Sequence, residues 1–234
     1  FGPPQTFRCA LIGGAHAPEG LVARAIRSGW PLALTYGATE MTSQIATATP
    51  SQTAAKPGTV GCPLVGVEMQ IGNDGELSVR GQTRAIGYVS EEGAMLHDTQ
   101  GWYHTGDLGH IDGEGDLWIT GRRIDRIVSG GVTIDAMEVE EVLRSHPGVL
   151  DACVVGLDDE EWGERVAAWI EAPEDGFDKD AVELHVRKRL VAAKRPRVWH
   201  LGGVLPQNAN GKVDRRSVRD ILGRDLAGRS PDRA

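Results

Sequence analysis

The chain has 234 residues, of which 40% are hydrophobic and 25% are charged, a composition typical of globular proteins with one or two domains. Its 33 acidic and 25 basic residues give a formal net charge of −8, which argues against general binding to nucleic acid or to an anionic membrane surface. The sequence contains no run of about 18 apolar residues, so a membrane span is not expected.

The cysteines and the first residues of the chain indicate its cellular location. Cys9, Cys62 and Cys153 are far apart and form no CxxC pair, which argues against a zinc site and favours reduced thiols in the cytoplasm. The first stretch, FGPPQTF, has neither the basic region nor the long apolar core of a signal peptide. Because it leads almost at once into a strand-like run, we expect the chain to be a fragment that begins inside a larger domain.

The first part of the chain alternates predicted strands and helices. CALIGGA (9–15) and PLALTYG (31–37) are short apolar runs that predict buried strands, and APEGLVARAIRSG (17–29) predicts a helix between them. TYGATEMTSQIATATP (35–50) is predicted to start a second helix. This order is typical of an α/β layer with a parallel sheet, in which ligands bind beyond the strand ends.

The middle of the chain, 58–120, is predicted to be a unit of short antiparallel strands. VEMQIGNDGELSVRG (67–81) alternates in hydrophobicity around an Asn-Asp-Gly turn, which indicates a hairpin. LGHIDGEGDLWITG (108–121) repeats the same design.

A charged connector, GRRIDRIVSGG (121–131), predicts a boundary between two domains, 1–123 and 124–234. Beyond it we expect a compact α+β lobe. Its predicted elements are a strand, glycine turn and strand at 126–134, a helix at 136–146, two strands at 149–157 and 165–172, a helix at 179–190 and a short helix at 212–222.

Two clusters of candidate binding residues follow the predicted strands of the first part. Gly13, Gly14 and Ala15 would let the backbone approach a flat ligand, or would form an ordinary strand-to-helix turn. The hydroxyl of Thr39 at a helix start favours phosphate, and Glu40 then makes sense if Mg²⁺ bridges it to that phosphate. Alternatively, Thr39 caps the helix and Glu40 faces its dipole.

Three further charged residues are candidates. Asp107 after a tight turn could accept two hydrogen bonds from ribose hydroxyls, or could cap that turn. Arg122 could bind ribose or phosphate oxygens, or could be a solvated charge of the connector. Lys212 follows an Asn-Gly turn and could neutralise a developing phosphoryl or carboxyl charge, or could simply be exposed.

Taken in order, five motifs resemble the adenylate-forming superfamily of acyl-CoA ligases, firefly-type luciferases and peptide-synthetase adenylation domains. They are GGA, YGATE, GWYHTGDLG, GRRIDRIVSGGVTIDAMEVE and LPQNANGK, and they extend from Gly13 to about Arg216. The resemblance implies a two-step reaction. A carboxylate attacks the α-phosphate of ATP to give an acyl-adenylate and pyrophosphate, and a thiol, usually that of CoA, then displaces AMP.

The resemblance also implies a fold and a set of roles. The fold would be the C-terminal part of a large N-domain, with a parallel-sheet segment and a small β-barrel-like subdomain, followed by the α+β lobe. Adenine would bind at Gly13, Gly14 and Ala15 and stack on Tyr36 beside Gly37. The implied partners of the rest of the nucleotide are Thr39 for the α-phosphate, Glu40 for Mg²⁺, and Asp107 with Arg122 for the ribose.

In this family the C-terminal domain rotates between the two steps. The resemblance implies that Lys212 acts in adenylation and that the loop of Ser129, Gly130 and Gly131 acts in thioester formation. Many relatives have an acid immediately before the final Asp of the hinge, where this chain has Ile124 before Asp125. The pair Ile124 and Asp125 is therefore the predicted hinge.

The stretch YGATEMTSQI is similar to the o-succinylbenzoate–CoA ligases of menaquinone biosynthesis. Ser43 and Gln44 would then lie one helical turn past Glu40, where they could bind a second carboxylate or a ketone of an aromatic acid, or face solvent. The implied cosubstrates are ATP, Mg²⁺ and CoA, and relatives are commonly homodimers.

Other functions stay open at this point. The chain could belong to another aryl- or acyl-CoA ligase, to an adenylation domain of an assembly line, or to an inactive nucleotide-binding fragment. The family's phosphate-covering loop normally lies well upstream of GGA, so we expect this chain alone to adenylate poorly or not at all.

Overall fold

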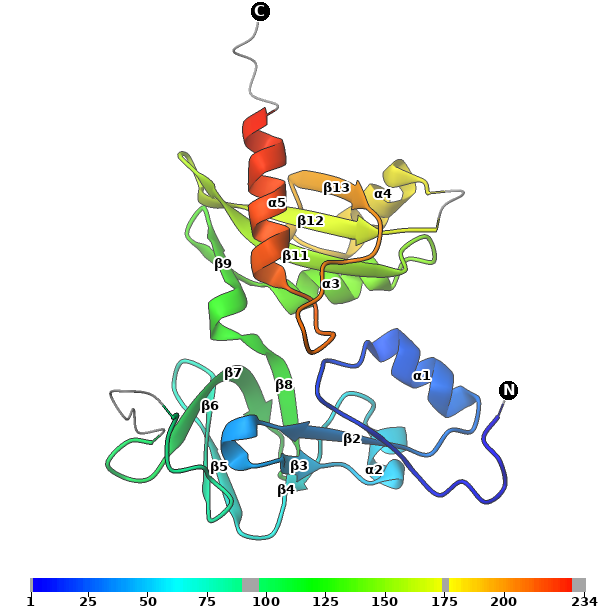
Figure 1. The fold of residues 1–234 in the computed structure, drawn as a ribbon. Helices are drawn as coiled ribbons and strands as arrows, with labels where there is room; N and C mark the ends of the chain where they lie inside the picture. The colour runs from blue at the N-terminus through cyan, green and yellow to red at the C-terminus, as the bar shows by residue number, and fades with distance from the viewer. Residues whose placement is uncertain (1, 90–96, 174–176, 229–234) are drawn as a thin grey trace, which may run out of the picture. The chain divides into compact units, whose positions relative to one another are not determined.

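The chain divides into two compact units, Phe1–Arg123 and Ile124–Ala234 (Figure 1). The structure is a computed structural model that describes residues 2–89, 97–173 and 177–228. Over these ranges, no helix has both the length and the apolar character that crossing a membrane would require.

The first unit contains a mixed four-stranded sheet in the order β1-β2-β3-β4. The pair β1–β2 is parallel, whereas β3 and β4 join by antiparallel pairing, so the predicted parallel sheet is confirmed for one pair only. Helix α1 begins after Pro18 and packs Val22 against β2. The bounds are β1 Ala10–Ile12, α1 Glu19–Arg27, β2 Leu32–Gly37, β3 Gln44–Thr47, α2 Pro50–Ala55 and β4 Cys62–Pro63.

The prediction that a helix starts at Thr39 is wrong. Only one 3₁₀ turn, Thr39–Met41, forms there, and Thr42 then takes a left-handed conformation with φ 69° that leads into β3. Ile45 and Ala46 of β3 are fully buried, and Ala46 pairs with Tyr36 on one side and Pro63 on the other, so burial in the sheet outweighs local helix preference. The helix begins only at Pro50, where Thr49 provides a capping box.

A second sheet of the first unit is antiparallel throughout, in the order β5-β6-β7-β8. The two hairpins predicted at 67–81 and 108–121 are confirmed. The buried side chains of Leu77, Val79 and Leu117 pack with Met41 and Ile45, which joins this sheet to the first. The bounds are β5 Val67–Ile71, β6 Glu76–Gly81, β7 Tyr103–Ile111 and β8 Leu117–Arg122.

The second unit is a five-stranded sheet with helices on both faces (Figure 1). Strand β12 lies at its centre and pairs with β11, β13 and β9. Alternate residues of β11 and β12 face α3 and α4 on one side and α5 on the other. The predicted compact α+β lobe is thus confirmed, while β13 is not among the predicted elements and the last helix is longer than expected. The bounds are η2 Arg123–Asp125, β9 Arg126–Ser129, β10 Val132–Asp135, α3 Ala136–Arg144, β11 Asp151–Asp159, β12 Gly163–Glu171, α4 Lys179–Arg189, η3 Ala192–Lys194, β13 Val198–Gly202 and α5 Arg215–Gly228.

Candidate functional site

The parallel pairing of β1 and β2 places the first two predicted motifs side by side. Because Ile12 pairs with Leu34, the residues that follow each strand lie at the same sheet edge. Gly13 fits tightly, since a Cβ atom there would lie 2.5 Å from Cγ2 of Thr35. Gly14 has φ +86°, a backbone conformation that favours glycine at this position. No atom lies within 4 Å of an added Cβ there, so the surface beside Gly14 is open. Ala15 beside it is exposed.

A tight loop after β2 presents Thr39 and Glu40. The amide of Ala38 donates to the carbonyl oxygen of Ser43 at 3.0 Å, which closes the loop. A Cβ on Gly37 would lie 2.2 Å from that same oxygen, so a glycine is required here for packing alone. Thr39 is exposed and Glu40 is half-buried, so a ligand at the sheet edge can reach both.

Asp107 is a buried carboxylate that three strands surround. It is 5% exposed and lies opposite Arg122 in the β7–β8 register. Nε of Arg122 lies 2.6 Å from Oδ1 of Asp107, and the hydroxyl of Tyr36 from β2 donates to Oδ2 at 2.5 Å. Burial and the neighbouring Asp107 charge raise the pKa of Tyr36, so its hydroxyl stays protonated and donates. The carboxylate keeps lone pairs for further donors, such as the hydroxyls of a sugar.

Glu40 belongs to a second cluster, which contains the two other tyrosines of the chain. The hydroxyl of Tyr88 donates to Oε1 of Glu40 at 2.5 Å. This bond is the main reason why the pKa of Glu40 is lowered, and Tyr103 adds to it. Burial, followed by the charge of Glu40, raises the pKa of Tyr103. Glu40 is therefore a carboxylate that stays ionised and is held by phenolic hydroxyls.

Sequence reasoning did not identify Tyr88 or Tyr103 as members of the site. No local pattern marks Tyr88, which lies 48 residues from Glu40. One signal was available, because the chain has only three tyrosines and all three contact or neighbour the predicted carboxylates.

The chemistry of Glu40 fits a magnesium ion that a phosphate also holds. Among the residues that the structure describes, no group of three or more His, Cys, Asp or Glu side chains could hold a metal by itself. Mg²⁺ commonly uses one or two carboxylates together with phosphate oxygens and water, so one ionised glutamate suffices when a nucleotide supplies the remaining ligands.

The prediction that Ser43 and Gln44 lie one helical turn past Glu40 is wrong. Ser43 is exposed in the turn after the 3₁₀ helix, and Gln44 opens β3 opposite Gly37. Both residues therefore lie at the same sheet edge as Tyr36, but extended backbone replaces the predicted helical spacing.

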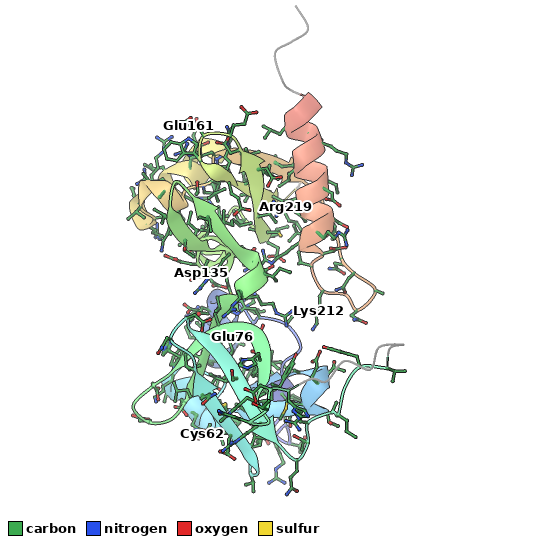
Figure 2. All side chains as sticks on the ribbon, turned by 90° about the vertical axis from the view of Figure 1, so that its left-hand side faces the viewer. Cys62, Glu76, Asp135, Glu161, Lys212 and Arg219 are labelled. Carbon is green, nitrogen blue, oxygen red and sulfur yellow. The ribbon has the colours of Figure 1, made fainter. Side chains whose placement is uncertain are left out.

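Lys212 lies on a small hairpin that precedes α5 (Figure 2). Gln207 and Val213 form a β-bridge, and Oδ1 of Asn208 accepts a hydrogen bond from the amide of Lys212 at 3.1 Å. Gly211 makes the turn with φ +73°. The backbone of this hairpin is thus well fixed, while Lys212 itself is exposed.

Gly130 and Gly131 form the tight turn between Ser129, the last residue of β9, and β10. Both glycines have positive φ, +58° and +78°, which suits a two-residue hairpin turn. A Cβ on Gly130 would lie 2.6 Å from the ring of Trp162, and the Gly130 amide donates to the Trp162 carbonyl at 2.8 Å. Ile124 is 88% exposed, and Asp125 forms an ion pair with Arg215 at 3.1 Å.

Two sequence-family models match the chain. The AMP-binding enzyme family matches residues 3–89, and the AMP-binding enzyme C-terminal domain matches residues 138–212. The 2-succinylbenzoate–CoA ligase of Bacillus licheniformis is 38% identical over 225 residues, which are 92% of this chain and 47% of that ligase. This chain therefore spans about half the length of the curated relatives that it matches.

Solved structures of similar proteins agree with these matches. The o-succinylbenzoate–CoA synthetase of Bacillus subtilis, solved with its acyl-adenylate intermediate, gives a TM-score of 0.85 at 35% identity over 94% of this chain and 47% of that one. The same enzyme has been solved with ATP and a magnesium ion. An amide bond synthetase of Marinactinospora thermotolerans gives a TM-score of 0.83 at 32% identity over 92% of this chain and 46% of that one.

Proposed function

Because the chain belongs to the AMP-binding enzyme family, we propose that it forms part of an ATP-dependent acid–CoA ligase that activates o-succinylbenzoate. In the first step a carboxylate oxygen of the acid bonds to the α-phosphorus of ATP, and the bond to pyrophosphate breaks. In the second step the sulfur of CoA bonds to the acyl carbon, its proton is lost, and AMP leaves. The names of the relatives support this acid and this thiol.

The observation that carries the proposal is the pair of tyrosine-bound carboxylates beside the sheet edge of the first unit. Asp107 is buried, held by Tyr36 and balanced by Arg122, which suits a ribose whose two hydroxyls need an acceptor. Glu40 stays ionised on the neighbouring loop, which suits a magnesium ion at the phosphates. Adenine would lie over the glycines after β1, with Tyr36 as the stacking ring and Gly37 beside it.

When bound, ATP and Mg²⁺ would supply the electrophilic phosphorus and the neutralising charge. The residues of this chain would orient that phosphorus and stabilise the charge that develops on it. Thr39 would donate its hydroxyl to the α-phosphate, because it is exposed next to Glu40. Lys212, carried by its fixed hairpin, would bring an ammonium to the carboxylate and the α-phosphate during the first step.

The boundary between the units would serve as the hinge of a two-step cycle. We propose that residues 1–123 are the end of the large nucleotide-binding domain and that 124–234 is the small mobile domain, with Ile124 and Asp125 at the joint. The turn of Ser129, Gly130 and Gly131 would replace the Lys212 hairpin in the second step. Gly131 has no atom within 4 Å of an added Cβ, so its backbone is open and a narrow substrate such as the thiol arm of CoA could pass there.

Two residues of the first unit are candidates for recognising the acid. Ser43 and Gln44 lie at the sheet edge beside Tyr36, where a hydroxyl and an amide could bind the second carboxylate or the ketone of o-succinylbenzoate. The similarity to an amide bond synthetase favours a second candidate, in which the same acyl-adenylate is formed but an amine takes the place of CoA.

A panel of acids tests the proposal. The complete protein, with any sequence upstream of Phe1 retained, is incubated with ATP, Mg²⁺ and each acid, and pyrophosphate and acyl-CoA are both measured. We expect o-succinylbenzoate to give the fastest release of pyrophosphate and a CoA thioester as product, and we expect the 234-residue chain alone to be far slower. A preference for another acid, or an adenylate that amines but not CoA consume, would refute the assigned reaction.

We also make proposals for where the enzyme is located and for its oligomeric state. The three cysteines of the chain are unpaired in the structure, which agrees with a cytoplasmic ligase that uses ATP and CoA. We also propose a homodimer for the complete protein, which its mass in solution would test.

A further inference from the structure

Arg215, the first residue of α5, contacts three segments that are far apart in the sequence. Its Nε lies 3.1 Å from Oδ2 of Asp125, at the predicted hinge. Its two terminal nitrogens bind both carboxylate oxygens of Glu140 on α3, with Nη2 at 2.9 Å from Oε2. Nη1 also donates to the carbonyl oxygen of Val154 on β11 at 2.9 Å. One guanidinium therefore joins the hinge, a helix and the central sheet of the second unit.

Glu140 makes this junction firm because it is almost completely buried, with 2% exposure. Its Oε1 also accepts a hydrogen bond from the amide of Val154 at 2.8 Å, and its Oε2 accepts one from Arg144 at 3.3 Å. A buried carboxylate that lost these partners would be strongly unfavourable. Arg215 is therefore held in place by the core of the unit, and Asp125 is held through Arg215.

The Lys212 hairpin is attached to the same point. Lys212 lies three residues before Arg215, and Asp214 between them accepts hydrogen bonds from Ser217, 3.2 Å from its amide and 2.8 Å from its hydroxyl. The amide of Asp214 donates to the carbonyl oxygen of Pro206 at 2.8 Å, which closes the base of the hairpin. The start of α5 thus fixes where the hairpin begins.

The other side of the predicted hinge is held by the first unit. Arg123 forms ion pairs with Asp74 and with Glu76, the latter at 2.9 Å. Ile124, with 88% exposure, lies between Arg123 and Asp125. The backbone on each side of Ile124 is thus tied to a different unit by an ion pair.

We propose that Arg215 is a positioning residue for adenylation. It holds the hinge residue Asp125 and the Lys212 hairpin on one buried glutamate, so that Lys212 moves with the hinge end of its unit as one rigid piece. This inference rests on the proposed function for the role of Lys212, but the coupling itself is a property of the second unit.

Hydrogen exchange of the complete protein tests the coupling without any enzymatic readout. Arg215→Lys keeps the charge but loses the two-pronged contact with Glu140, and Arg219→Lys is the matched control, because Arg219 lies one turn further along α5 and pairs with Asp158 instead. We expect amides of both 124–128 and 207–213 to exchange about tenfold faster in Arg215→Lys, while those of β11 and β12 and those of the control are unchanged. Unchanged exchange in either segment would overturn the proposal.

Asp125→Asn provides a second test that leaves the pair of Arg215 and Glu140 intact. It applies even if Arg215→Lys loosens the whole unit. Amides at 124–128 should exchange faster, while amides at 207–213 should keep their rate because the hairpin remains attached to Glu140 through Arg215. Unchanged exchange at 124–128 would show that Arg215 does not hold the hinge residue, and faster exchange at 207–213 would show that the hairpin is not anchored independently.

A step-resolved assay then tests positioning of Lys212. Acid-dependent pyrophosphate release in the absence of CoA should be about tenfold slower in Arg215→Lys. Lys212→Ala combined with Arg215→Lys should be no slower than Lys212→Ala alone, because both changes act through the same ammonium. Losses that simply multiply would overturn the positioning role. If the unsubstituted protein adenylates no carboxylate, the proposed function fails, while hydrogen exchange still decides the coupling.

Discussion

Replacing Gly37 by alanine should destabilise the first unit far more than the same change at Gly14. An added Cβ at Gly37 would meet the Ser43 carbonyl oxygen at 2.2 Å, whereas the space around a Cβ at Gly14 is empty to 4 Å. The loop must therefore open in Gly37→Ala and lose the hydrogen bond from Ala38 to Ser43. Overpacking costs up to roughly 3 kcal/mol and the lost hydrogen bond roughly 1 kcal/mol. Alanine also lowers the entropy of the unfolded chain, which offsets part of this, so the free energy of unfolding should fall by about 3 kcal/mol.

Gly14→Ala should cost only about 1 kcal/mol, which is the penalty of a left-handed alanine less the same entropy gain. Calorimetric unfolding measures both changes. For a unit of this size, about 4 °C per kcal/mol predicts a fall of about 12 °C in the first-unit transition for Gly37→Ala and about 4 °C for Gly14→Ala. Equal shifts for the two variants would refute the reasoning that close approach of the Ser43 backbone, and not φ, requires a glycine at Gly37.

Three other predictions concern charged groups. Tyr36→Phe removes the donor to Asp107 and should weaken AMP binding about tenfold in calorimetric titration, whereas an unchanged Kd would contradict the ribose assignment. Glu140→Gln leaves the half-buried Arg144 and Arg215 short of their counter-charge and should lower the free energy of unfolding of the second unit by about 3 kcal/mol in urea titration, with the first unit as internal control. Tyr88→Phe should raise the pKa of Glu40, which carboxyl NMR measures directly. Because folding lowers the pKa of Glu40, ionised Glu40 stabilises the folded protein fully at a pH above its unfolded-state pKa. This stabilisation is lost as the pH falls through the folded-state pKa of Glu40, and Tyr88→Phe should make that loss smaller.

Hairpins and amphipathic helices could be predicted from the sequence because their signals are local. An Asn-Asp-Gly turn between alternating runs predicted β5 and β6, and the apolar spacing of Val182, Val186 and Leu190 predicted α4. The prediction for the stretch from Thr35 to Pro50 was wrong because its local sequence favours a helix, whereas its residues pair as a strand in the sheet. Ile45 and Ala46 gain more from burial between β2 and β4 than the stretch gains from continuing as a helix.

The contacts of the site could be predicted only in part. Ordered motifs indicated Asp107, Arg122 and Glu40, because each stands in a recognisable turn or connector. Tyr88 and Arg215 could not be found in this way. Each meets its carboxylate partner across a long separation, 48 residues for Tyr88 with Glu40 and 75 for Arg215 with Glu140, and no local spacing encodes such a contact.

All three tyrosines of the chain lie in the first unit. Since the pKa values of Tyr36 and Tyr103 are raised by burial, their phenols resist alkali for as long as that unit is folded. Phenolate absorbance therefore reports optically on this half of the chain, while the second unit, which has tryptophans but no tyrosine, stays silent in that signal. Loosening of the first unit can thus be followed separately from that of the second, with no label attached.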